Sequence, residues 1–127
     1  DATNGWIPTT DDDVTDVPVK TNTEGIFGYG DGYYSLTNLV SNAGVVATDV
    51  TGVGTARGGI AACEYGYDKG IFGFGYTGSD VSMTNLVSNA GVVATDVTGV
   101  GTGRYGPGAC EYGGDKGIFG FGQYAST

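Results

Sequence analysis

The segment TNLVSNAGVVATDVTGVGT occurs twice in this chain, at positions 37–55 and 84–102, without a single substitution. The offset is 47 residues, and the similarity continues so far that 39 consecutive positions differ at only five. A third, partial copy is GIFGYG at 25–30, which matches GIFGFG at 70–75 and again at 117–122. Repeats of this length are typical of folds in which each unit buries its apolar face against its neighbours.

Each unit divides into four short extended segments, because valine, isoleucine, tyrosine, phenylalanine and threonine cluster between glycine, asparagine and aspartate. No segment shows the apolar period of a capped helix, so we expect essentially no helix. In the complete unit the expected strands cover residues 57–65, 69–76, 82–88 and 92–97. We therefore expect an all-β fold of tandem four-stranded antiparallel repeats of 47 residues, like propeller blades. A β-solenoid is the alternative.

The order of segments within a unit resembles a known family. Arg57 opens a strand of small and apolar residues that runs to Cys63, Tyr65 and Gly66 form a turn, and the next strand closes on IFGFG at 71–75. This pattern is similar to the kelch-type propeller repeat. Similar repeats occur in surface and virion-associated proteins of phages, so the resemblance implies blade-like sheets and an extracellular or virion surface location.

The chain divides into two parts at about residue 20. Residues 1–20 hold five aspartates and two prolines, so we expect an acidic extended N-terminal arm, with Trp6 and Ile7 as its anchor on a neighbouring subunit. Residues 21–127 form the expected β-repeat domain. Its strands would number nine, two blades and one surplus strand, which cannot close a ring. We therefore expect open edges that copies of the same chain fill, as a closed ring or a filament.

The charge balance excludes several classes of function. Fourteen acidic and five basic side chains give a net charge of -9, which repels phosphate backbones and anionic lipids, so we expect neither nucleic acid nor a membrane as a partner. No apolar run approaches the roughly 20 residues of a membrane span. Histidine is absent, and no nucleophile stands beside a base in a recognisable motif. We therefore expect that the protein is not an enzyme.

The acidic residues recur once per unit, which favours structural roles, since a catalytic site is normally built once. The positions of Asp68 and Asp115 predict that their side chains form hydrogen bonds with the backbone of a strand hairpin, with the carboxylates as acceptors. Asp49 and Asp96, shortly before the arginines of the following strand, predict ion pairs between successive strands.

We expect no cofactor. Calcium is the one metal that the composition favours, because it prefers hard oxygen ligands, and the places for it are residues 11–13 and the loops around Asp31 and Asp80. Cys63 and Cys110 occupy equivalent positions in successive units. Such positions stack within disulfide reach in a solenoid but exceed about 7 Å on separate blades, so we expect two free, buried thiols.

The leading functional prediction is a non-enzymatic structural protein, a self-assembling β-repeat subunit of an extracellular or virion surface fibre or filament. Its expected partners are copies of itself. The alternative is an oligomeric propeller that recognises glycans or a host-surface protein. Tyrosines in or beside the predicted turns support this alternative, because aromatic rings stack on sugars. These candidate contact residues are Tyr33, Tyr34, Tyr67, Tyr76 and Tyr105.

Overall fold

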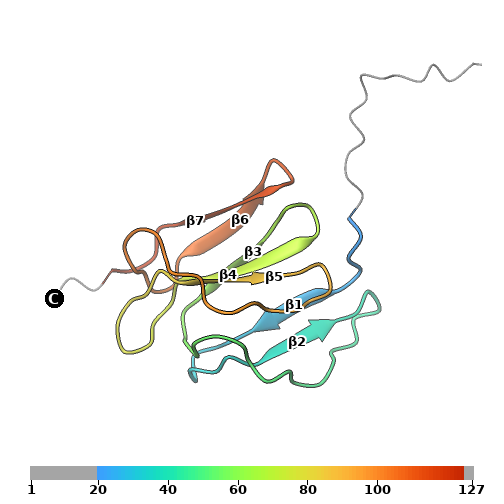
Figure 1. Ribbon diagram of the computed structural model, residues 1–127, viewed down its shortest axis with the longest axis horizontal. Helices are drawn as coiled ribbons and strands as arrows, with labels where there is room; N and C mark the ends of the chain where they lie inside the picture. Colours follow the sequence, from blue (N-terminus) through green and yellow to red (C-terminus); the bar gives the residue numbers. More distant parts are fainter. Residues whose placement is uncertain (1–19, 125–127) are drawn as a thin grey trace, which may run out of the picture.

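The computed structural model describes residues 20–124, which form seven β-strands in three small antiparallel sheets and no helix (Figure 1). The all-β prediction is confirmed. The predicted arm with Trp6 and Ile7 lies outside the described residues, which begin at Lys20. The strands are β1 (Gly25–Gly28), β2 (Thr37–Val40), β3 (Ala61–Tyr65), β4 (Lys69–Gly73), β5 (Thr84–Val87), β6 (Gly108–Tyr112) and β7 (Lys116–Gly120).

The GIFG and TNLV segments pair with each other in the same register wherever both are present. In the first sheet β1 pairs with β2 from Gly25↔Val40 to Gly28↔Thr37, and in the middle sheet β4 pairs with β5 in the matching register. Strand β3 adds to the other edge of β4, so the middle sheet has the order β3-β4-β5. The last sheet is the hairpin β6-β7.

The hairpin turns agree with the prediction from glycine and aspartate. Gly113 and Gly114 have φ angles of 66° and 78° in the turn between β6 and β7. Gly66 and Tyr67 take the equivalent places between β3 and β4, with φ angles of 59° and 68°. Two successive residues at positive φ are the signature of a tight hairpin turn whose twist matches that of the strands.

The expected fourth strand of each unit is not a regular strand. In the middle unit two isolated bridges, Thr84↔Val97 and Val87↔Val93, replace the predicted strand over 92–97. Between these bridges the returning segment has one more residue than β5, so a continuous ladder cannot form. The Asn85 side chain donates to the carbonyl of Ala94 at 3.1 Å within this bulged stretch. The described residues therefore form seven strands, not the nine that the sequence predicts.

The three sheets lie one beside the next in chain order (Figure 1). A pair of aromatic rings joins each sheet to the next. Tyr29 packs on Phe72 with ring centroids 5.2 Å apart, and this contact joins the first and middle sheets. Phe74 packs on Phe119 at 5.4 Å and joins the middle and last sheets. The buried apolar core lies on the first of these interfaces and consists of Tyr29, Phe72, Val87 and Val93, with Ile26 and Ile60 packed against it.

Simple strand alternation would place Phe72 and Phe74 on one face of their sheet, and that expectation is wrong. Phe72 contacts the first sheet, whereas Phe74 contacts the last. The reason is that β4 ends at Gly73 and Phe74 has a φ of 63°, which turns its ring to the other side. The last sheet also approaches Gly73 closely, since a Cβ on this glycine would lie 3.0 Å from the Phe119 ring.

Candidate functional site

Three of the five tyrosines singled out in the sequence gather in one cluster. The rings of Tyr33 and Tyr76 have centroids 6.2 Å apart, and those of Tyr76 and Tyr105 are 6.4 Å apart in an edge-to-face arrangement. The Tyr105 hydroxyl donates to Asp31 Oδ1 at 3.5 Å. We call Tyr33, Tyr76, Tyr105 and Asp31 the tyrosine cluster. Tyr33 is 51 % exposed and Tyr105 is 38 % exposed, so their rings remain accessible.

Backbone pairing at the ends of the sheets positions these rings. Tyr76 forms an isolated bridge with Gly58, and Tyr105 forms the equivalent bridge with Gln123. Tyr33 lies in a turn in which its own amide donates to the carbonyl of Gly30 at 3.1 Å. The cluster therefore joins a loop after β1, the segment after β4 and the segment before β6.

The other two tyrosines lie apart from the cluster. Tyr34 is 57 % exposed and lies against Gly32, where a side chain on the glycine would meet its ring. Tyr67 belongs to the turn between β3 and β4, and its ring lies 3.0 Å from where a Cβ on Gly114 would be. The sequence could not separate these two from the others, because all five tyrosines occur near turns.

A buried polar centre that the sequence pattern does not predict lies beside the interface between the first and middle sheets. Arg57 is fully buried, and its guanidinium lies 4.7 Å from the centre of the Tyr29 ring. The guanidinium donates to the carbonyls of Phe74 and Thr55 at 2.8 and 3.0 Å and to Asn85 Oδ1 at 2.6 Å. Every donor nitrogen of this side chain therefore has an acceptor within the protein, and the centre is structural.

The carboxylate of Asp96 completes this centre. It accepts hydrogen bonds from the Thr55 amide and hydroxyl and from Asn85 Nδ2, and it lies 3.8 Å from Arg57 Nη1. Burial disfavours its ionised form, but these hydrogen bonds and the arginine outweigh burial and lower the pKa of Asp96 below its ordinary value. The predicted pairing of each aspartate with the arginine that follows it is wrong, because the ion pair joins Asp96 to Arg57, which precedes it, and Asp49 instead accepts from Asn38 Nδ2.

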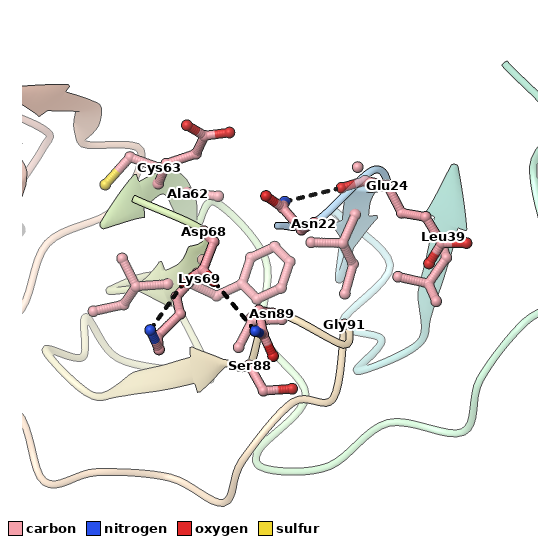
Figure 2. Close-up of a pocket in the computed structure, with 17 residues that line it drawn as sticks. Asn22, Glu24, Leu39, Ala62, Cys63, Asp68, Lys69, Ser88, Asn89 and Gly91 are labelled. Carbon is pink, nitrogen blue, oxygen red and sulfur yellow. Dashed lines mark hydrogen bonds and ion pairs between the residues drawn. The ribbon is translucent and has the colours of Figure 1, made fainter. Parts of the chain in front are cut away.

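A cavity of about 270 Å³ opens between the first and middle sheets. Its apolar wall includes Ile26, Leu39 and Phe72. Figure 2 shows the polar groups on its rim, which are Asn22, Glu24, Asp68, Lys69, Ser88 and Asn89.

The Asp68 carboxylate on this rim accepts hydrogen bonds from three neighbouring side chains. It accepts from the Thr21 hydroxyl at 2.7 Å, from Lys69 Nζ at 3.0 Å and from Asn89 Nδ2 at 3.2 Å. These hydrogen bonds lower the pKa of Asp68 from 3.8 to about 2. The predicted hydrogen bonds to the hairpin backbone are therefore replaced by bonds to three side chains, which leave the carboxylate little capacity for a ligand.

The cysteines are free, as expected, but they are not both buried. Cys63 is half-buried between the middle and last sheets, next to Gly117, and burial raises the pKa of its thiol. Cys110 is exposed, because no further sheet covers the last one. Among residues 20–124 no group of three acidic or cysteine side chains is placed to hold a metal ion. The aspartates at 11–13 lie outside this range.

No protein-family model matches the chain, and no curated protein is significantly similar to it.

Proposed function

We propose that this protein is a non-enzymatic structural subunit that assembles with copies of itself into a filament or ring at an extracellular or virion surface. The observation that carries this proposal is the contact between adjacent sheets, which uses equivalent residues at both interfaces. At each interface the aromatic residue after one GIFG strand packs on the phenylalanine within the GIFG strand of the next sheet. On each outer face of the molecule one partner of this contact is present without the other. The last sheet has the aromatic residue after its GIFG strand, and the first sheet has the phenylalanine within its GIFG strand.

The unmatched half on the last sheet is exposed. Phe121, the equivalent of Phe74, is 90 % exposed. A Cβ on Gly120 would meet no atom within 4 Å, whereas the same position in the middle sheet, Gly73, lies against Phe119. This face therefore offers an aromatic ring and a glycine slot of the kind that receives a phenylalanine inside the molecule.

The complementary half lies on the first sheet. Phe27 is the equivalent of Phe72 and Phe119, and it is 52 % exposed. If Phe27 of one copy packs on Gly120 and Phe121 of another, the contact repeats the internal one and buries two apolar rings. Such a head-to-tail contact uses different surfaces on the two partners, so it propagates into a filament or closes into a ring.

The unpaired sheet edges support the same proposal. Strand β4 is paired on both sides, whereas β1 and β7 are each paired on one side only among residues 20–124. Edge strands with free backbone groups favour association with further strands. The chain-order arrangement of the sheets is compatible with blades of a kelch-like propeller, and the kelch resemblance is our reason for proposing a virion or cell surface location.

The test is assembly measured by sedimentation velocity and negative-stain microscopy. We expect oligomers of the wild-type chain at micromolar concentrations, and at least tenfold weaker assembly for Phe27→Ser and for Phe121→Ser. The Phe27 variant keeps the Phe121 face, and the Phe121 variant keeps the Phe27 face. A mixture of the two variants should therefore form a dimer, but no larger oligomer, because the two remaining faces are both mutated. Val92→Ser is the matched control, because Val92 is 65 % exposed in the middle unit and its counterpart Val45 is 64 % exposed, so a neighbouring sheet does not cover this position. A wild-type chain that stays monomeric would contradict the proposal.

A further inference from the structure

We propose that the tyrosine cluster is a binding site for neutral carbohydrate chains. This inference is independent of assembly, because all of its residues belong to one chain. In this cluster three tyrosine rings come together from separate segments of the chain and remain accessible. Tyr33 and Tyr105 are 51 % and 38 % exposed, and Tyr76 lies between them.

The cluster is built from residues that the repeats do not share. The position equivalent to Tyr105 is Gly58, and the position equivalent to Tyr76 is Gln123. A Cβ on Gly58 would lie 3.3 Å from the Asp31 backbone, so a ring at this position would have to displace the loop that carries Asp31. Among residues 20–124 the three rings therefore meet at one place only, whereas the phenylalanine contacts occur at both interfaces.

The backbone conformation of Tyr33 fixes the direction of its ring. Its φ angle is 56°, a left-handed conformation that is unfavourable for a residue with a large side chain. Tyr67 and Phe74 adopt the same conformation in turns of the sheets, so this feature orients the ring and is not by itself evidence of a ligand.

The chemistry of the cluster selects the class of ligand. Tyrosine offers a rigid apolar face with one polar end, which suits the C–H face and the hydroxyls of a sugar ring. The Asp31 carboxylate is an acceptor beside the rings, 3.5 Å from the Tyr105 hydroxyl. A chain with a net charge of -9 disfavours sulfated or uronic-acid glycans. Neutral hexose chains are therefore the favoured ligands.

The experiment is calorimetric titration and saturation-transfer NMR with cellohexaose, maltohexaose and a β-galactohexaose, against a polyuronate hexasaccharide. We expect at least one neutral hexasaccharide to bind and the polyuronate to bind at least tenfold more weakly. Tyr105→Ala should weaken the binding at least tenfold. Tyr112→Ala, which removes a tyrosine 52 % exposed outside the cluster, should leave it unchanged.

Tyr33→Gly separates binding from folding. Glycine adopts a positive φ without strain, so the variant should unfold at or above the wild-type temperature while it loses at least tenfold in affinity. Binding of no neutral hexasaccharide, or wild-type affinity in both Tyr33→Gly and Tyr105→Ala, would overturn the proposal. Equal binding of the polyuronate would overturn the assignment to neutral sugars. These outcomes do not depend on whether the chain assembles.

Discussion

Two positions of the repeated segment are buried in the middle sheet and more exposed in the first. Asn85 is fully buried and Val93 is 9 % exposed, whereas their counterparts Asn38, half-buried, and Val46, 54 % exposed, face solvent. The local hydrogen bonds are alike, since both asparagines donate to an alanine carbonyl and to an aspartate. The difference comes from neighbouring sheets, so burial here depends on the place of a unit in the stack.

The two arginines at equivalent positions of the repeats differ in the same way. Arg57 is enclosed between the first and middle sheets and bonds three acceptors, whereas Arg104 is partly exposed and its guanidinium donates to the Phe121 carbonyl at 3.1 Å. The presence of a neighbouring sheet therefore determines whether the arginine at this position is buried. The buried arginine links a strand end, a loop and a side chain, whereas the partly exposed one binds a single carbonyl.

The largest expected effect is the loss of the buried arginine. Arg57→Met should lower the free energy of unfolding by about 3 kcal/mol, because Asn85 Oδ1 and two carbonyls lose their donors in a buried place. Arg104→Met should cost about 1 kcal/mol or less, since water can replace its single bond. Urea denaturation at a concentration where the chain is monomeric measures both. Equal losses would mean that position in the stack does not determine the energetics.

A smaller difference is expected for the repeated valines. Val93→Ala should cost about 2 kcal/mol, because it removes buried methyl groups and leaves a gap in the core. Val46→Ala, in the same local sequence, should change stability by less than about 0.5 kcal/mol. Thermal unfolding of the pair provides the measurement. If Val46→Ala were as destabilising as Val93→Ala, Val46 would have to be covered in solution, as a self-assembled chain would allow.

The sequence predicts the pairing of GIFG with TNLV, because each segment is short, apolar and bounded by turn residues. It does not predict the break in the fourth strand. That break depends on one extra residue between two bridges, which becomes visible only once the register from Thr84 to Val97 is known. A pattern of β-formers alone cannot distinguish a strand from a bulged return segment.

The candidate site is predicted in part for a related reason. Two of the five differences between the repeats are exchanges of tyrosine and glycine, and both have a spatial cause. Tyr67 lies over Gly114, its own counterpart in the next unit, and Tyr105 lies over Gly59, beside its counterpart Gly58. The sequence identifies these positions as different, but only the stacked sheets explain why one partner is large where the other must be small.

The smallest expected effect concerns the aspartate of the turn in two sheets. Asp68 accepts from Thr21, Lys69 and Asn89, whereas the Asp115 side chain accepts from Lys116 and forms a hydrogen bond with its own backbone, as predicted for this turn. Both pKa values are lowered, that of Asp68 from 3.8 to about 2. A lowered folded-state pKa contributes stability that is present above pH 3.8 and is lost as the pH falls toward 2. Asp68→Asn should therefore flatten the acid limb of a thermal-stability profile in this window more than Asp115→Asn does. Because Asp68 is only partly covered and its partner Lys69 is exposed, salt should weaken the effect. Equal profiles for the two variants would show that the contacts with Thr21 and Asn89 contribute nothing to stability.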